Sequence, residues 1–241
     1  MRSEVLGLPV DVLSRVETIN MIDGWLRQSV RKPRMVVTAY SEFYVKAQKD
    51  RVFAEIVRKA DLVTPDGVSV LAGVRYNQRT QGIKNARTQG RVIKLMVEGL
   101  RVGGWGNVSL RTATLALERF PELRVSYDRG EDQVGTDRTT DDRVVKKINA
   151  DKPDLLFVAY NPVKQEKWIA SHLSQLKVGV VMGVGGTFNE YLGDFMQSPV
   201  WMERIGLKWL WRVMVEPKRA GRIFRAVVVF PWLVFVRSLR K

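Results

Sequence analysis

The sequence predicts an α/β fold of the Rossmann-like type, a mostly parallel sheet with helices on both faces, followed by a helical C-terminal appendage. Three observations support this fold. Short apolar segments rich in Val and Leu alternate with longer segments of helical periodicity as far as residue 198. Glycine, proline or aspartate bounds the apolar segments, as expected at the ends of buried strands. Beyond residue 198 the pattern is helical only.

The apolar segments give the strands and the intervening segments give the helices. Strands are predicted at Met35–Ala39, Leu62–Thr64, around Leu100–Gly103, Leu123–Tyr127, Leu155–Tyr160 and Val178–Met182. Helices are predicted at Ser41–Ala60, Val68–Tyr76, Arg91–Leu100, Ser109–Phe120, Asp141–Ala150 and Pro162–Leu176. Ligands of such sheets bind beyond the carboxyl ends of the strands, so the residues that follow each strand are the first candidates for a site.

The chain is expected to divide into an α/β domain over residues 1–198 and a basic, tryptophan-rich helical appendage over residues 199–241. Pro217 and Pro231 should split the appendage into about three helical pieces. Residues 201–241 hold ten Lys or Arg against two Glu, and four of the seven tryptophans. This mixture is typical of a helix at a membrane surface. The alternative is a set of helices packed on the domain, with the arginines in solvent.

The composition restricts the chemistry and the partners. A net charge of +15 indicates an anionic partner, either nucleic acid, an anionic membrane or a phosphorylated ligand. Cysteine is absent, and the single histidine, His172, cannot form a zinc site alone. The longest uncharged apolar run, Ala226–Val236, has 11 residues, whereas a spanning helix needs about 20. With no apolar signal segment near Met1, we expect a cytoplasmic protein.

The segment Thr64-Pro65-Asp66-Gly67 follows a predicted strand and opens a helix. Asp66 should therefore lie at the carboxyl end of that strand, where its carboxylate could accept a proton from a substrate hydroxyl as a general base. Aspartate also caps helices well, and the residues alone leave both roles open.

Other polar residues and two glycine loops follow predicted strands. Thr38 could hydrogen-bond a sugar or phosphate, and Glu42 could bind a hydroxyl or complete a capping box, although structural roles are commoner for both. The loops around Gly104 and Gly185 could bring backbone N–H groups to a phosphate. Neither loop has the ending of a P-loop or the spacing of a dinucleotide-binding motif.

The segment Lys164-Gln165-Glu166-Lys167-Trp168 begins a helix directly after another predicted strand. Gln165 could read a nucleobase or a sugar, and Trp168 is expected to be buried. No Asp-x-Asp pair follows a strand, so we expect no metal and no cofactor, with arginines and backbone N–H groups stabilising the leaving-group charge.

Together these motifs resemble the WecG/TagA/CpsF family of glycosyltransferases over nearly the whole chain. The matching segments are Gly7-Leu8-Pro9-Val10-Asp11, Thr38 with Glu42, Ala47-Gln48-Lys49-Asp50, Pro65-Asp66-Gly67, Lys164-Gln165-Glu166-Lys167-Trp168, Gly183-Val184-Gly185-Gly186-Thr187-Phe188, Pro199, Trp201, Gly206-Leu207, Trp209-Leu210, Arg212 and Glu216-Pro217-x-Arg219. The chain departs from the family pattern at four places, namely Tyr40 for Asn, Val92 for Asp, Asn161-Pro162-Val163 for Gly-x-Pro, and Asn189 for Asp.

The resemblance implies an inverting hexosyltransferase. Such an enzyme moves N-acetylmannosamine, or a related hexose or uronic acid, from a UDP-sugar to an acceptor sugar on a polyprenyl diphosphate, in the synthesis of a cell-surface polysaccharide or exopolysaccharide. By this resemblance Asp66 would be the catalytic base, Thr38 would position a substrate and Gln165 would hold the nucleotide sugar. The expected ligands of diphosphate and substrate are Arg212, Arg219, Arg222, Glu42, Gly104, Gly185 and Asn189.

The resemblance also implies a peripheral protein on the inner face of the cell membrane, attached through the appendage. A homo-oligomer is a further partner that the sequence allows. One alternative is a catalytically degenerate relative that binds nucleotide sugar or lipid without transfer. A basic nucleic-acid-binding protein is less favoured, and no nucleic acid is expected, because aromatic and basic residues do not interleave on a predicted sheet. A dehydrogenase fits the glycine loops poorly.

Overall fold

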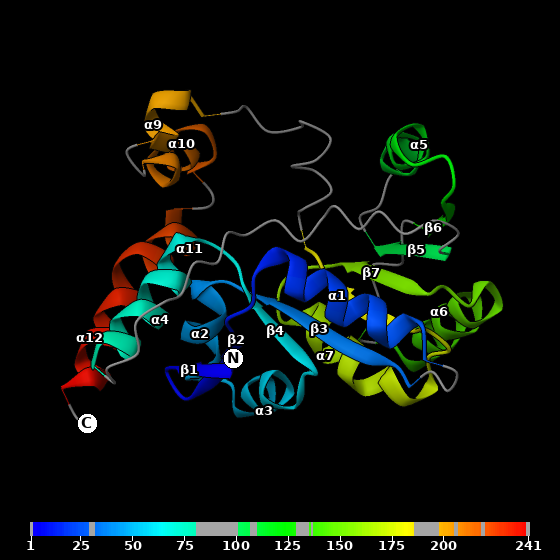
Figure 1. Cartoon of the computed structure of the whole chain (residues 1–241), viewed down its shortest axis with the longest axis horizontal. Helices are drawn as coiled ribbons and strands as arrows, with labels where there is room; N and C mark the ends of the chain where they lie inside the picture. The colour runs from blue at the N-terminus through cyan, green and yellow to red at the C-terminus, as the bar shows by residue number, and fades with distance from the viewer. Residues whose placement is uncertain are drawn as a thin grey trace.

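The computed structural model describes residues 2–28, 32–80, 101–106, 110–128, 135, 137–185, 198–204, 207–217 and 220–239. Its centre is a six-stranded parallel sheet in the order β4-β3-β8-β7-β5-β6 (Figure 1). The strands are β3 (Arg34–Ala39), β4 (Leu62–Pro65), β5 (Arg101–Gly106), β6 (Arg124–Asp128), β7 (Leu155–Ala159) and β8 (Val180–Gly183). The predicted α/β fold is thus confirmed, and each predicted strand lies within a few residues of an observed one.

Helices cover both faces of this sheet. They are α1 (Arg15–Leu26), α2 (Ser41–Ala47), α3 (Arg51–Lys59), α4 (Val68–Thr80), α5 (Leu110–Arg119), α6 (Arg138–Asp151) and α7 (Lys164–His172), which continues into the 3-10 turn η1 (Leu173–Gln175). Alternate side chains of β3 enter different cores, because successive residues of a strand point to opposite faces. Met35 and Val37 share a core with α3, α6 and α7, whereas Val36 shares one with α1.

Two strands and a helix before Met35 were not predicted. β1 (Arg2–Val5) and β2 (Leu8–Asp11) form an antiparallel hairpin, and α1 follows it. Asp11, the last residue of β2, accepts a hydrogen bond of 2.7 Å at Oδ2 from the backbone N–H of Val63. Since β4 is an edge strand, the aspartate of the Gly-x-Pro-x-Asp motif satisfies a backbone donor that the sheet leaves unpaired.

The single helix predicted over residues 41–60 was wrong, because the structure has two helices there. Asp50 is the N-cap of α3 and its side chain accepts a 3.0 Å hydrogen bond from the N–H of Phe53. The apolar pattern does not reveal this break, since Ala47 before it and Phe53 after it are both buried. The helix predicted at 91–100 lies outside the described residues.

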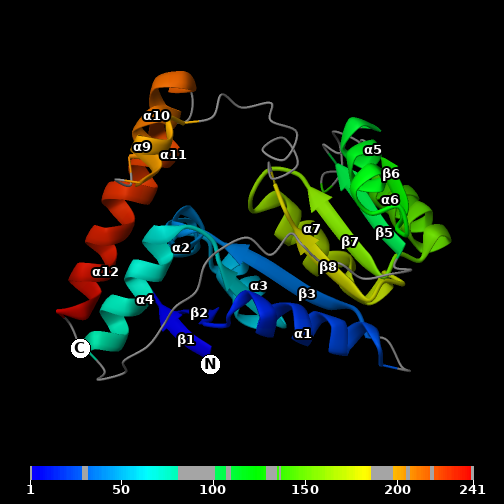
Figure 2. The same cartoon turned by 45° about the horizontal axis from the view of Figure 1, so that its top comes forward.

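The described chain after residue 198 is helical, as predicted, but its divisions differ. It contains α9 (Val200–Arg204), α10 (Lys208–Val215), α11 (Ala220–Phe224) and α12 (Phe230–Ser238), and the π-helical segment η3 (Arg225–Val229) joins the last two (Figure 2). The prediction that Pro231 ends a helix was wrong. The N–H of Phe230 bonds to the carbonyl of Arg225, and Pro231 lies in the first turn of α12, where proline is tolerated.

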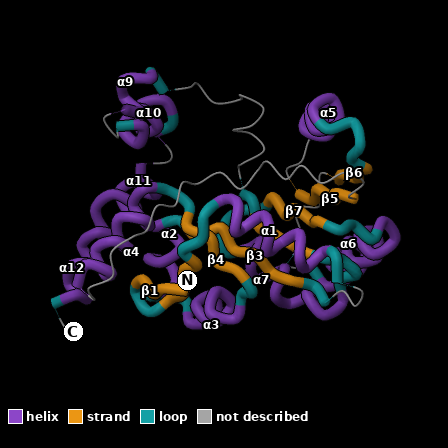
Figure 3. Tube along the Cα trace, in the orientation of Figure 1, coloured by secondary structure: helices purple, strands orange, loops and turns teal. Residues whose placement is uncertain are grey.

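The continuous segment α11–η3–α12, which we call the C-terminal rod, packs against the α/β part beside α4 (Figures 1 and 3). The Phe230 ring is buried, with its centroid 5.8 Å from that of Tyr44 on α2. A Cβ atom added to Gly73 on α4 would lie 3.3 Å from the Phe230 ring, so the rod approaches α4 closely. Val234 is buried in the same core. Within the described ranges, none of the helices combines the length and apolarity needed to cross a membrane.

Candidate functional site

The carboxyl ends of the parallel strands bring several predicted site residues to one edge of the sheet. Thr38 on β3 donates a 3.0 Å hydrogen bond from Oγ1 to the carbonyl of Gly183 at the end of β8. Because β3 and β8 are neighbours, this bond fixes the two strand ends relative to each other. The sequence predicts a substrate contact for Thr38. In the structure, its half-buried hydroxyl donates to the protein backbone.

Asp66 follows β4 directly and its side chain is exposed at this edge. Its backbone N–H donates a 2.8 Å hydrogen bond to the carbonyl of Ala39, which extends the pairing of β3 and β4. Gly67 has φ +89°, a conformation that glycine adopts readily, and it turns the chain into α4. Since α4 begins at Val68, Gly67 and not Asp66 occupies the N-cap position. The Asp66 carboxylate thus lies at the surface, between the end of β4 and the start of α4.

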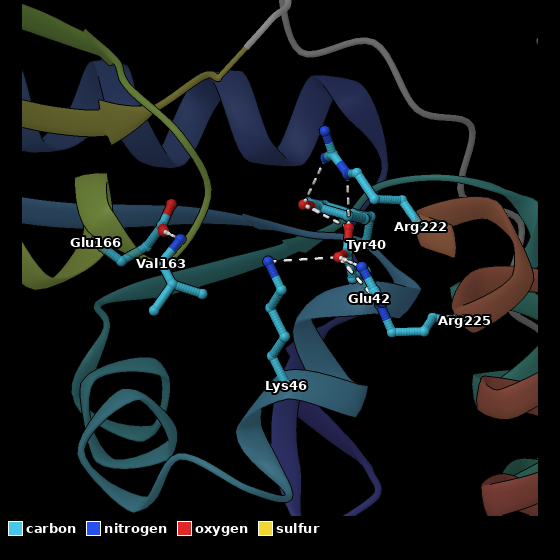
Figure 4. Close-up of polar contacts among 7 residues, drawn as sticks. All are labelled: Tyr40, Glu42, Lys46, Val163, Glu166, Arg222 and Arg225. Atoms are coloured by element: carbon cyan, nitrogen blue, oxygen red, sulfur yellow. Dashed lines mark hydrogen bonds and ion pairs between the residues drawn. The ribbon is translucent and has the colours of Figure 1, made fainter. Parts of the chain in front are cut away.

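Glu42 is a buried carboxylate in the first turn of α2, with an exposed fraction of 1%. Arg222 donates from Nε to Oε2 over 2.9 Å, and Arg225 donates from Nη2 to Oε1 over 2.9 Å (Figure 4). Lys46 Nζ lies 3.4 Å from Oε1. Because both arginines belong to the C-terminal rod, these bonds join the rod to the helix that follows β3.

Tyr40 completes this group, which we call the Glu42 cluster. Its hydroxyl accepts a 3.1 Å hydrogen bond from Arg222 and donates a 3.4 Å one to Glu42. Burial, with the Glu42 charge beside it, raises the pKa of Tyr40, so the hydroxyl stays protonated. Burial also opposes ionisation of Glu42, but hydrogen bonds from Arg222 and Arg225 and the charge of Lys46 outweigh it and lower the pKa of Glu42. Glu42 is thus an anion at neutral pH.

A second buried network lies at the start of α7. Gln165 accepts a 3.0 Å hydrogen bond at Oε1 from the N–H of Gly185, and its Nε2 donates to Glu166 over 2.5 Å. The other oxygen of Glu166 accepts a 2.6 Å bond from the N–H of Val163. Burial raises the pKa of Glu166 to about 7, against these hydrogen bonds, which lower it.

This network holds the loop after β8 in place. A Cβ atom on Gly183 would lie 2.6 Å from Gln165 Nε2, so only glycine lets the strand end approach the amide so closely. Gln165 is 2% exposed, and its amide joins α7 to the Gly185 loop. The resemblance implies that Gln165 holds the nucleotide sugar. In the structure, its Oε1 accepts a hydrogen bond from the backbone N–H of Gly185.

The structure describes only some of the remaining predicted site residues. Gly104 is buried within β5, and Gly185, two residues after the end of β8, has φ +50°. Arg212 lies on α10, but its side chain is outside the description, and Arg219, Asn189 and Val92 lie outside the described residues. Within the described ranges, no group of three or more His, Cys, Asp or Glu comes together as a metal-ligand set.

Lys46 and Arg225 were not predicted as site residues. Local spacing could have indicated both, because Glu42 and Lys46 are four residues apart on α2, and Arg222 and Arg225 are three residues apart on the C-terminal rod. Residues at these spacings share one face of a helix. Their common partner could not be read from that spacing, since Glu42 and Arg222 are 180 residues apart in the chain.

Comparison with known proteins gives one family and a set of relatives. The family described as glycosyl transferase WecG/TagA/CpsF matches residues 3–241. Relatives from Staphylococcus aureus strains NCTC 8325 / PS 47 and COL are each 26% identical over 242 residues, covering 96% of this chain and 91% of theirs. Both are named N-acetylglucosaminyldiphosphoundecaprenol N-acetyl-beta-D-mannosaminyltransferase.

Proposed function

This chain belongs to the WecG/TagA/CpsF family of glycosyl transferases, and on that basis we propose that it moves a hexose from a UDP-sugar to a sugar on a polyprenyl diphosphate. The proposed donor sugar is N-acetylmannosamine or a related hexose or uronic acid, and the product is a precursor of a cell-surface polysaccharide. The relatives' name describes transfer of N-acetylmannosamine to N-acetylglucosaminyl diphosphoundecaprenol, which supports this donor and acceptor.

The observation that carries the proposal is the exposed carboxylate of Asp66 at the carboxyl end of β4. Open α/β sheets bind their ligands at this edge. Thr38 and the loop of Gly185 lie at the ends of neighbouring strands in the same sheet. An exposed carboxylate can reach an acceptor hydroxyl, whereas the carboxylates of Glu42 and Glu166 are buried. Asp66 is thus the best-placed base in the described part of this edge.

The proposed reaction is a single displacement. Asp66 takes the proton of the acceptor hydroxyl while that oxygen bonds to the anomeric carbon of the donor. The bond between this carbon and the UDP oxygen breaks on the opposite face, so the configuration inverts. Negative charge grows on the departing diphosphate, and arginines with backbone N–H groups can stabilise it without a metal or a cofactor.

The acceptor's lipid also requires a membrane surface near the site. Exposed large apolar residues gather on the C-terminal helices, namely Trp201, Trp209, Met214, Phe224, Trp232 and Phe235. Tryptophans and basic side chains on one element suit the headgroup region of an anionic bilayer. We therefore propose a peripheral protein on the cytoplasmic face of the cell membrane, attached through these helices.

The test is UDP release from a panel of UDP-sugars, with and without an N-acetylglucosaminyl diphosphate lipid. Asp66→Asn should lower acceptor-dependent release by about 100- to 10,000-fold, the usual contribution of a general base. Asp128→Asn is the matched control, because Asp128 lies at the carboxyl end of β6, the strand farthest from β4 in the sheet, and should leave the rate unchanged.

Two results would contradict the proposal. Retention of configuration in the product would exclude the single displacement. Binding of a UDP-sugar by the folded protein, with no release from any donor, would instead support a degenerate relative that binds without transfer. A loss in Asp128→Asn equal to that in Asp66→Asn would show that the loss is not specific to the proposed base.

A further inference from the structure

The Glu42 cluster holds more positive than negative charge at the edge where the proposed reaction takes place. Three cations, Arg222, Arg225 and Lys46, lie within 3.4 Å of the single carboxylate of Glu42. Without that carboxylate the cations would repel one another, because like charges this close are unfavourable. Glu42 thus offsets the charge of two arginines of the C-terminal rod, which reach its carboxylate from different sides (Figure 4).

Each oxygen of Glu42 serves a different arginine. Oε2 accepts from Nε of Arg222, and Oε1 accepts from Nε and Nη2 of Arg225, over 3.3 Å and 2.9 Å. A guanidinium carries five N–H donors in a fixed plane, so these bonds set the orientation of each group and leave further N–H donors. The side chain of Arg222 is 42% exposed and that of Arg225 is 41% exposed, so both can still meet a solvent-borne anion.

From this arrangement we propose that Glu42 is a positioning residue, which fixes Arg222 and Arg225 in the orientation that receives the diphosphate of the acceptor lipid. The proposal rests on the proposed function and replaces the sequence-based expectation that Glu42 binds substrate itself. With 1% of Glu42 exposed, a substrate cannot reach its carboxylate while the rod is docked. Glu42 therefore acts through the arginines, and Arg225 joins Arg222 as a ligand of the diphosphate.

The kinetic test compares Glu42→Gln with wild type in the full chain. Glutamine keeps one acceptor oxygen and loses the charge, so one arginine loses its partner. We expect the KM for the N-acetylglucosaminyl diphosphate lipid to rise roughly 10- to 100-fold, as for a ligand displaced by about an ångström. Hydrolysis of the UDP-sugar without acceptor should change less than about 3-fold. Glu55→Gln is the control, since it removes an exposed ion pair with Arg58 that lies outside the Glu42 cluster.

A double-mutant cycle with Arg225→Gln separates positioning from independent effects. If Glu42 acts through the arginines, the double variant should have nearly the acceptor KM of Glu42→Gln alone, because residues in one network are not additive. Multiplicative effects on KM would overturn the proposal, as would an unchanged KM in Glu42→Gln. Equal losses in acceptor use and donor hydrolysis would indicate a general folding defect and would also overturn it.

A second measurement needs no enzymatic activity and so separates this proposal from the proposed function. Trypsin cuts after arginine, and the Glu42 cluster engages the side chains of Arg222 and Arg225. Soluble N-acetylglucosaminyl diphosphate should slow cleavage after these two residues in wild type, and it should protect Glu42→Gln much less. Glu42→Asp, which keeps the charge on a shorter stem, should be intermediate. Equal protection in all three proteins would overturn the proposal even if the enzyme transfers sugar.

Discussion

Two buried glutamates, Glu42 and Glu166, lie near the same edge of the sheet in opposite electrostatic surroundings. Each is 1% exposed. Arginines and a lysine surround Glu42 and lower its pKa, whereas backbone and amide N–H groups surround Glu166, and burial raises its pKa to about 7. Equal solvent exposure therefore does not give equal protonation, because the deeper burial of Glu166 and the cationic partners of Glu42 favour opposite states. Glu42 joins the C-terminal rod to the sheet, and Glu166 orders a loop of the sheet itself.

The largest expected effect comes from removing the charge of the first glutamate. Glu42→Ala leaves three cations without their partner, and breaking a buried ion pair costs about 3–5 kcal/mol of unfolding free energy. Because water still reaches both guanidinium groups, we expect the free energy of unfolding to fall by about 3 kcal/mol, measured by urea unfolding at pH 7. A loss below about 1 kcal/mol would mean that the cluster contributes no more than an ordinary surface ion pair.

The pH dependence of that loss has a definite sign. The pKa of Glu42 in the folded protein is lower than its ordinary value, so the carboxylate contributes its stability above the ordinary pKa and loses it as the pH falls through the lowered one. The difference between wild type and Glu42→Ala should therefore be constant from about pH 6 to 8 and shrink only below about pH 4.

Glu166 should show the opposite dependence. Its pKa rises from 4.5 to about 7 on folding, so between these values the folded state keeps a proton that the unfolded state releases. Its contribution to stability is therefore greatest below about pH 4.5 and falls as the pH rises towards 7, by up to about 3 kcal/mol at about 1.4 kcal/mol per pH unit. Urea unfolding of wild type and Glu166→Gln at pH 5 and pH 8 measures this change in the contribution of Glu166 to the free energy of unfolding. A difference that is flat across this range would contradict the comparison of the two glutamates.

The smallest expected effect tests how tightly the Glu166 network is packed. Gly183→Ala places a Cβ atom 2.6 Å from Gln165 Nε2 and 2.7 Å from Glu166 Oε1, so at least one hydrogen bond must lengthen. We expect a loss of about 1–3 kcal/mol in thermal or urea unfolding. Gly24→Ala is the control, because a Cβ on this residue of α1 meets nothing within 4 Å and should stabilise the helix by about 1 kcal/mol. Equal stability of both variants would show that the network can relax.

Much of the sheet could be predicted from the sequence because its signals are local. Apolar segments bounded by turn residues located the six strands, and parallel topology then placed Thr38, Asp66 and Gly185 at one edge. The hairpin β1–β2 was missed, since its strands have four residues each and lack a continuous apolar run. The bond between Asp11 and Val63 depends on tertiary packing across 52 residues.

The candidate site was predictable only in part for the same reason. A motif places Asp66 directly after its strand, and local sequence suffices for that. The role of Glu42 depends on arginines 180 and 183 residues away, and no local pattern pairs them. Pro231 also gave the wrong boundary, because the change from α- to π-helical bonding before it leaves room for a proline that would otherwise interrupt the helix.

The π-helical segment η3 also sets which side chains of the C-terminal rod share one side. In an α-helix of 3.6 residues per turn, two residues five apart, such as Arg225 and Phe230, would point about 140° away from each other. The hydrogen bond from the Phe230 N–H to the Arg225 carbonyl places one nearly above the other. The ionic anchor on Glu42 and the apolar anchor between α2 and α4 therefore lie on one side of one rigid helix. One face of the rod therefore meets both a charged side chain and an aromatic one of α2.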